Sequence, residues 1–228
     1  MEILLLIILL AIISPGFISF IIIPLLIIIG VILLIQVLFH SVSTIFIVPR
    51  SLLWIAFNKR IRQNHALEHA TVNVLEEHFG QTSLGGYATK DGFKLRGASN
   101  ISPELILEAA QTGLSRLRKG EKELALHTRC GSSLLISNFL FSILIIAVLI
   151  FMKFFNLFLF IALIIGINLL ARPLGRLTQK YITTSPDVEN IMITKLDVQQ
   201  AGSNPFFNVF FREFHVHTEK CTPGNILY

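Results

Sequence analysis

Charged residues are scarce in this chain of 228 residues: they make up 14% of it, against 53% hydrophobic residues. A soluble domain carries about 25% charged residues and a disordered chain carries few aliphatic ones, so both classes are excluded. Residues 3–49 contain no Asp, Glu, Lys or Arg, and residues 131–171 contain only Lys153. Because about 20 apolar helical residues cross a bilayer, the sequence predicts an integral membrane protein.

Other features are lacking as well. The sequence contains no G-x-x-x-x-G-K-[ST] or G-x-G-x-x-G pattern after a predicted strand, which excludes a phosphate-binding loop of either kind. The apolar blocks hold no acid or base apart from Lys153, which argues against a transporter. The two cysteines, Cys130 and Cys221, are expected to be reduced thiols if the polar parts face the cytoplasm.

The net charge is +5, and the basic residues flank the apolar blocks. They are Arg50, Lys59, Arg60 and Arg62 after the first block, Arg129 before the second, and Arg172, Arg176 and Lys180 after it. This is the positive-inside pattern, which predicts that both polar parts face the cytoplasm. It also accounts for the basic pI, so we expect the lipid bilayer as a partner and no nucleic acid.

The pattern predicts a mostly α membrane protein that carries a small α+β cytoplasmic module. The predicted segments are N-terminal membrane helices over 1–57, as a hairpin or a re-entrant element broken at Ser14-Pro15-Gly16; a cytoplasmic α+β module over 58–130; a transmembrane helical hairpin over 131–171 with Lys153 near its turn; and a C-terminal cytoplasmic segment over 172–228 whose β-hairpin packs on the module. Residues 17–39 are long enough to cross, and residues 43–57 suit an interfacial stretch.

Local signals predict the elements of the polar parts. They are a helix from His65 to about His78, capped by Asn64 and ended by Gly80; a β-hairpin from Gly85 to Arg96 that turns at Asp91-Gly92; a helix from Ser102 to near Gly120; an extended piece over Leu124–Leu126; and strands over 191–199 and 209–218, joined by a loop containing Asn204-Pro205.

One cluster carries the chemistry: His65, Glu68 and His69 form an H-x-x-E-H pattern on the first predicted helix. At about 100° per residue, both imidazoles lie on one flank and can bind one ion, with Glu68 beside them. Zinc hydrolysis needs neutral nitrogen ligands, an open position for water and a carboxylate that takes its proton. The pattern, known as the inverted zinc-protease signature, predicts His65 and His69 as zinc ligands and Glu68 as the general base.

A third protein ligand is required, and the sequence leaves it open. His127 and Cys130 form an H-x-x-C step directly before the second apolar block; we favour His127, while Cys130 can equally be a small buried residue. Glu76 lies about 13 Å along the helix from the histidines. At that distance it is better placed to contact the metal ligands or the substrate than to bind the ion itself. His215 and His217 lie on one face of a predicted strand, and a solvated face is the preferred interpretation over a metal pair.

These residues predict a membrane-bound zinc metallohydrolase, and specifically a peptidase acting on a peptide or membrane-protein substrate at the cytoplasmic membrane surface. One alternative is a non-catalytic scaffold or regulatory protein with a structural metal site, which a closed set of four ligands would favour. A plainer alternative is an amphipathic helix whose His and Glu side chains face water, with Glu68 paired to Arg62 or Lys59.

Several motifs in one order give a resemblance. They are His65-x-x-Glu68-His69-x-Thr71 with Glu76, then Leu126-His127-x-Arg129-Cys130-Gly131-x-Ser133, then Gln179-Lys180 and Thr183-Thr184-x-Pro186-Asp187. In these the chain resembles the YqhQ-like family of bacterial membrane proteins, and it is similar to a sister group of small membrane proteins known only as a domain of unknown function. The resemblance covers about 60–190 and implies a module anchored in the bacterial cytoplasmic membrane, with no established activity. Through it Asp187 becomes another possible metal ligand, or a helix cap after Pro186.

Overall fold

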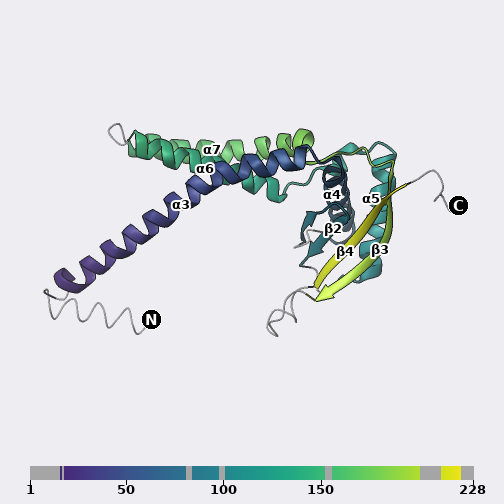
Figure 1. Ribbon diagram of the computed structural model, residues 1–228, viewed down its shortest axis with the longest axis horizontal. Coiled ribbons are helices and arrows are strands. Elements are labelled where there is room, and N and C mark those ends of the chain that lie inside the picture. The colour runs from purple at the N-terminus through teal and green to yellow at the C-terminus, as the bar shows by residue number, and fades with distance from the viewer. Residues whose placement is uncertain are drawn as a thin grey trace.

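A computed structural model of the chain describes residue 16 and residues 18–80, 84–97, 101–151, 156–200 and 212–221. Long apolar helices lie at one end of the molecule, and a module of shorter helices and a sheet lies at the other (Figure 1). The chain is therefore mostly α with a small antiparallel sheet, as the sequence predicts. The start of the predicted N-terminal membrane segment, with its break at Ser14-Pro15, lies outside the described residues, as do the Lys153 turn and the loop at Asn204-Pro205.

Three helices are long and apolar enough to cross a membrane: Phe20–Ala56, Gly131–Ile150 and Phe158–Thr183. The first consists of the π-helical turn η1 (Ile18–Ile22) and α3 (Ile23–Ala56). The others contain α6 (Gly131–Ile150) and α7 (Leu157–Thr178), the latter continued by the π-helical turn η4 (Gln179–Thr183). The last part of α3 lies beside α6 and η4, and α6 pairs with α7 as the predicted helical hairpin (Figure 1).

The helix α3 runs without a break through the stretch 43–57 that the sequence separates from the first span. Its 34 residues include Pro49 in the helix interior. At 1.5 Å per residue, α3 is about 51 Å long, whereas the hydrocarbon core of a bilayer is about 30 Å thick. A bilayer could therefore cover only part of α3.

The helix α4 (Lys59–Phe79) carries the H-x-x-E-H residues and begins earlier than predicted. Asn58 caps it, because its side chain accepts a hydrogen bond from the Ile61 N–H, and Gly80 ends it at a φ of 73° as predicted. The prediction that Asn64 caps the helix is wrong. The Asn64 side chain instead bonds across the module, donating to the Thr89 carbonyl oxygen at 2.8 Å.

The four strands form one antiparallel sheet in the order β1-β2-β4-β3. They are β1 (Gly85–Ala88), β2 (Gly92–Arg96), β3 (Ile191–Gln200) and β4 (Arg212–Lys220), so both predicted hairpins are confirmed. The predicted helix with its Ser102 cap is α5 (Pro103–Arg118). The extended piece predicted over Leu124–Leu126 is wrong, because the 3₁₀ turn η2 (Lys122–Ala125) includes Leu124 and Ala125. The Leu124 and Leu126 N–H groups each donate to the carbonyl oxygen three positions earlier, of Glu121 and Glu123.

The core lies between one face of the sheet and the helices α4 and α5. Its largest members are Leu67 and Leu75 of α4, Ile106 of α5, Phe93 and Leu95 of β2, and Phe214 and Val216 of β4. Strand residues alternate between faces, so His215 and His217 lie on the other face of β4. The expectation of a solvated face is wrong for His215, which is 7% exposed, because the side chains around it on that face cover it.

On the outer face, Glu213 of β4 pairs with two cations of β2. The Lys94 ammonium lies 2.8 Å and the Arg96 guanidinium 2.6 Å from its carboxylate oxygens. Hydrogen bonding to Lys94, and then to Arg96, lowers the pKa of Glu213 below its usual value of 4.5. We expect Glu213→Gln to destabilise the protein at pH 7 by about 1–2 kcal/mol, since charge-assisted bonds are lost.

Because the folded-state pKa of Glu213 is lowered, this stability is present above pH 4.5 and is lost as the pH falls below it. The difference in Tm between Glu213→Gln and the wild type, measured in detergent, should therefore shrink below pH 4.5. The exposed Glu108 serves as the matched control, and Glu108→Gln should leave the Tm unchanged at every pH. An equal loss in both variants would contradict the role given to the Glu213 pairs.

Candidate metal centre

His65, Glu68 and His69 share the face of α4 that points toward the start of α6 and the end of η4. The two imidazole rings lie with centroids 4.3 Å apart. His69 is 2% exposed and Glu68 is 5% exposed, so the interpretation in which these side chains face water is wrong. The two cations that the sequence offers as ion-pair partners of Glu68 bond elsewhere. Lys59 pairs with Asp187, and Arg62 donates to the Thr184 carbonyl oxygen.

Backbone carbonyl groups fix the orientation of both histidines. The Nδ1 atom of His65 lies 2.9 Å from the Thr183 oxygen, and that of His69 lies 2.7 Å from the Ala125 oxygen. A carbonyl oxygen only accepts hydrogen bonds, so each Nδ1 carries the proton and each Nε2 has its lone pair free. This is the arrangement by which proteins orient metal-binding histidines, with an outer partner on the other ring nitrogen.

The thiol of Cys130 completes a group of three ligand atoms. Its Sγ lies 3.4 Å from His65 Nε2, and one ligand atom from each of His65, His69 and Cys130 lies within 4.8 Å of the others. A nitrogen and a sulfur bound to one tetrahedral zinc are about 3.5 Å apart, given bonds of about 2.0 and 2.3 Å. The separation of Cys130 from His65 therefore fits a shared zinc ion.

The carboxylate of Glu68 lies at the edge of this group. Its Oε2 is 4.0 Å from His65 Nε2, is buried and makes no hydrogen bond. Burial raises the pKa of Glu68 to about 8. The strand β1 packs against this carboxylate at Gly86, where an added Cβ would lie 2.7 Å from Glu68 Oε1. Given that pKa, the Glu68 carboxyl is mostly protonated at pH 7 in the metal-free protein. A bound cation would favour the carboxylate, which has no hydrogen bond at Oε2 to break before it accepts a proton from a metal-bound water.

Burial sets the protonation of the ligand residues. It lowers the pKa of His65, and it lowers that of His69 well below the usual value, with the neighbouring His65 adding to the effect. Both imidazoles are thus neutral at pH 7, which is the form that binds a metal. Burial raises the pKa of the Cys130 thiol. A bound metal would offset this, because a coordinating thiol is deprotonated.

His127, the favoured third ligand in the sequence, lies beside the group rather than in it. Its ring centroid is 6.0 Å from that of His69, and its Nε2 lies 3.3 Å from Glu76 Oε2. Glu76 also pairs with Arg129. Cys130, the other candidate, occupies the third position, and Asp187 lies in its ion pair with Lys59, outside the group.

Gln179 of η4 joins this part of the module to the apolar helices. It is 1% exposed, accepts from the His127 N–H at 3.0 Å and donates to the His127 carbonyl oxygen at 3.0 Å. It also donates to Ser133 Oγ in α6 at 3.2 Å. Gln179 belongs to the motifs of the family resemblance, but no spacing rule links it to His127. Likewise, nothing in the sequence pointed to the Thr183 and Ala125 carbonyl groups.

A groove of about 1400 Å³ adjoins the centre. Its lining includes Glu76, His127 and Arg129 from the module, with Ser133 of α6, Arg176 of α7 and Gln179 of η4. It therefore reaches His127, beside the ligand group, and is bounded on another side by the apolar helices; none of the described residues that line it is His65, Glu68, His69 or Cys130. Both charged side chains and apolar surface line it.

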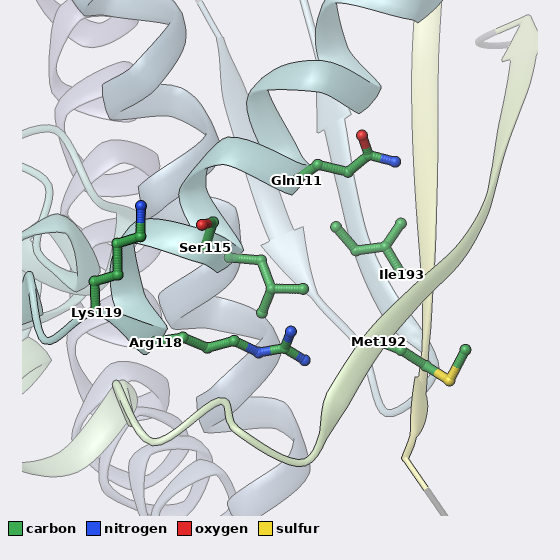
Figure 2. Close-up of a pocket in the computed structure, with 7 residues that line it drawn as sticks. Gln111, Ser115, Arg118, Lys119, Met192 and Ile193 are labelled. Atoms are coloured by element: carbon green, nitrogen blue, oxygen red, sulfur yellow. The ribbon is translucent and has the colours of Figure 1, made fainter. Parts of the chain in front are cut away.

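A separate hollow of about 480 Å³ lies between α5 and β3 (Figure 2). Arg118, which lines it, donates to the Ile191 carbonyl oxygen at 2.5 Å. The other lining residues are Gln111, Leu114, Ser115, Lys119, Met192 and Ile193. Among these described residues no imidazole, thiol or carboxylate is present, so the hollow offers no ligand set and no general base.

Residues 60–196 match the family described as "Domain of unknown function (DUF6391)". The chain belongs to the DUF6391 family. The match spans α4, the β1–β2 hairpin, the α6–α7 pair and most of β3, so all the ligand residues of the centre lie in the family region. Membership confirms the predicted likeness to a family of unknown function, while the likeness to the YqhQ-like family stays a prediction.

An uncharacterized protein of Picosynechococcus sp. (strain ATCC 27264 / PCC 7002 / PR-6) is 40% identical to this DUF6391 protein over 85 residues. The aligned part is 32% of this chain and 40% of the relative, so the chain spans less than half of the relative's length. No solved structure matches the chain.

Proposed function

We propose that this DUF6391 protein is a membrane-bound zinc hydrolase that cleaves peptide bonds at the membrane surface. The observation that carries the proposal is the buried group of His65, His69 and Cys130, with Glu68 at its edge. Three protein ligands leave the fourth position of a tetrahedral zinc for water, which is the composition of a catalytic site. His65, Glu68 and His69 belong to α4, and Cys130 is the residue directly before α6.

The chemistry follows from the roles of these residues. Zinc held by His65, His69 and Cys130 would lower the pKa of a bound water to about 7. Glu68, as the carboxylate, would take a proton from that water, and the water oxygen would attack the peptide carbonyl carbon. The carbon–nitrogen bond would then break as Glu68 passed the proton to the leaving amine. One water is consumed, and one carboxylate and one amine are formed.

The position of the centre supports a substrate at a membrane. Cys130 is the cap of α6, and Thr183, which holds His65, is the last residue of η4, so the apolar helices begin and end at the centre. Three helices are able to cross a bilayer. Arg129 lies just before α6, and Arg172 and Arg176 lie in the last two turns of α7. By the positive-inside rule these basic residues support our proposal that the module faces the cytoplasm.

The metal is tested by the zinc content of the protein purified in detergent. His65→Ala, His69→Ala and Cys130→Ala should each lose one zinc per chain, because three protein ligands are the minimum for a tight site. His78→Ala is the matched control, since His78 is an exposed histidine of the same helix. Full zinc occupancy in the three ligand variants would refute the centre.

The reaction is tested with peptides displayed on lipid nanodiscs that contain the purified protein, with cleavage read by mass spectrometry. Zinc-dependent cleavage that stops on chelation and returns on adding Zn²⁺ is the expected result. If the zinc-loaded protein cleaves no peptide of a diverse library, the proposed zinc centre stands and the proposed peptidase activity is refuted.

One observation favours a second candidate function, a scaffold with a structural zinc. The His127 ring is 6.0 Å from that of His69, close enough for a rotation of its side chain to supply a fourth ligand. A site with four protein ligands leaves no position for water. The zinc affinity of His127→Ala decides between the two: an unchanged affinity supports the open hydrolytic centre, and an affinity weakened at least about tenfold supports the closed structural one.

A further inference from the structure

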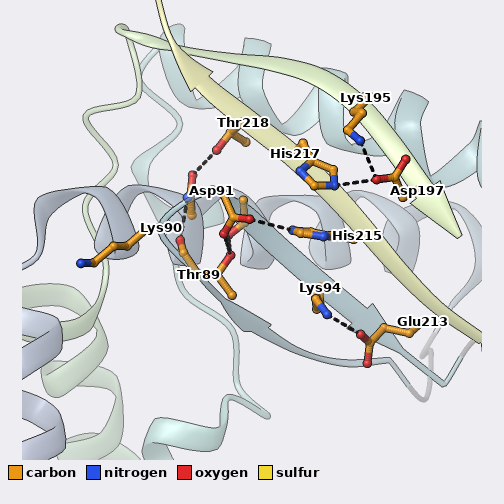
Figure 3. A network of polar contacts seen from close by, with 12 residues as sticks. Thr89, Lys90, Asp91, Lys94, Lys195, Asp197, Glu213, His215, His217 and Thr218 are labelled. Atoms are coloured by element: carbon orange, nitrogen blue, oxygen red, sulfur yellow. Dashed lines mark hydrogen bonds and ion pairs between the residues drawn. The ribbon is translucent and has the colours of Figure 1, made fainter. Parts of the chain in front are cut away.

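A second group of ligand residues lies on the outer face of the sheet, away from the core (Figure 3). His215 and His217 come from β4, and Asp91 precedes β2 in the turn between β1 and β2. The strand register brings them together, because His217 faces Gly92 across the β2–β4 pair. Asp91 precedes the two histidines by more than 120 positions in the chain. None of the three residues belongs to the centre on α4 or lines the groove beside it.

The three side chains lie at metal-binding distances from one another. The two imidazole rings have centroids 3.7 Å apart, and His215 Nε2 lies 3.9 Å from Asp91 Oδ2. One ligand atom from each of the three lies within 4.8 Å of the others. Two ligands of one zinc lie about 3.3 Å apart, so small side-chain rotations would bring the three onto one ion.

One ring nitrogen of His215 is buried in this group. The residue is 7% exposed, and its Nε2 is buried and makes no hydrogen bond. Buried polar atoms of proteins are nearly always hydrogen-bonded. The Nε2 atom of His215 instead faces the Asp91 carboxylate at 3.9 Å, a separation that leaves it available to coordinate an ion.

The backbone fixes Asp91 against β4. Its carbonyl oxygen accepts from the Thr218 N–H at 2.9 Å, and its Oδ1 accepts from the Thr89 hydroxyl at 2.7 Å. The close approach depends on Gly92, whose φ is 152° and where an added Cβ would lie 2.0 Å from the Val216 carbonyl oxygen. The remaining oxygen, Oδ2, is the one nearest to His215.

We propose that Asp91, His215 and His217 form a second zinc site, which ties the β1–β2 turn to β4. Two imidazole nitrogens and a carboxylate oxygen are a ligand set that zinc takes. Asp197 lies beside the three residues: its Oδ2 pairs both with His217 Nε2 and with the Lys195 ammonium, each at 2.8 Å. The role we assign to the site is structural, because one ion would hold the turn and β4 together. It does not depend on the proposed hydrolase function.

The test is the zinc stoichiometry of the full chain in detergent, titrated with Zn²⁺ alone against a chromophoric chelator after metal removal. The wild type should bind two ions. Asp91→Asn and His217→Ala should weaken one of them at least about tenfold, since loss of a ligand costs no less than loss of an outer partner. His69→Ala should abolish the other ion, and His78→Ala should leave both.

We include Asp91→Asn because this variant is expected to fold even if His217→Ala does not. Its side chain is 67% exposed, and an asparagine Oδ1 can still accept the Thr89 hydroxyl bond. A wild type that binds a single ion, lost in His69→Ala, would overturn the second site and leave the centre on α4. A wild type that binds a single ion, lost in His217→Ala, would instead overturn the centre on α4 and leave the second site. Two ions unaffected by both Asp91→Asn and His217→Ala would also overturn the second site.

Discussion

Replacing Glu68 by glutamine should lower kcat for peptide hydrolysis by at least about 10²-fold and leave the zinc content unchanged. The glutamine amide keeps the shape of the side chain but cannot take a proton from the bound water. Glu68 Oε2 lies 4.0 Å from His65 Nε2 and makes no hydrogen bond, so no other described contact competes for it. Steady-state kinetics with a cleaved peptide, alongside metal analysis, measures both quantities.

Stability provides the control for Glu68→Gln. The variant loses no hydrogen bond of Oε2, and it removes a buried carboxyl whose pKa is raised to about 8 by that burial. Its Tm should therefore be no lower than that of the wild type, as is common where an active site trades stability for function. Turnover within a factor of two of the wild type would remove the base role. Loss of zinc would instead make Glu68 a ligand.

Replacing Gly86 by alanine should lower both stability and activity. The new Cβ would lie 2.6 Å from the Lys94 carbonyl oxygen and 2.7 Å from Glu68 Oε1. The backbone oxygen cannot yield without parting β1 from β2, which we expect to cost about 2–3 kcal/mol. The carboxylate would be displaced from the centre, and a shift of about 1 Å in a catalytic group can cost about 10²-fold in rate.

The neighbouring glycine offers a matched control. An added Cβ at Gly85 would meet no atom within 4 Å, so Gly85→Ala should keep the Tm and the kcat of the wild type. Thermal unfolding and kinetics of the two variants, purified in parallel, make the comparison. If Gly86→Ala behaves like Gly85→Ala, then β1 does not constrain Glu68.

Local sequence signals were sufficient for most elements of the fold. The apolar blocks, the Ser102 cap of α5, the Gly80 stop of α4 and the turn before Gly92 depend on neighbouring residues only. The errors arose where a residue serves a distant partner. Asn64 has the composition of a helix cap, but its amide bonds to Thr89 in the β1–β2 turn, and Asn58 caps the helix instead.

The same division applies to the candidate centre. The spacing of His65, Glu68 and His69 predicted their common face, because helical periodicity alone determines it. The sequence could not choose between His127 and Cys130, which are only three residues apart. The packing of η2 and the start of α6 against α4 places Cys130 Sγ at 3.4 Å from His65 Nε2 and leaves His127 with Glu76.

The scarcity and placement of charge by themselves determined that this chain has helices able to cross a membrane and a polar module beside them. The sequence also determined which helix carries the His and Glu residues. Only the tertiary structure decided the third member of the ligand group, the carbonyl groups that orient the histidines, and the meeting of Asp91 with His215 and His217. The physical reason is range: periodicity acts over a few residues, whereas these contacts depend on helix packing and strand register across 50 residues or more.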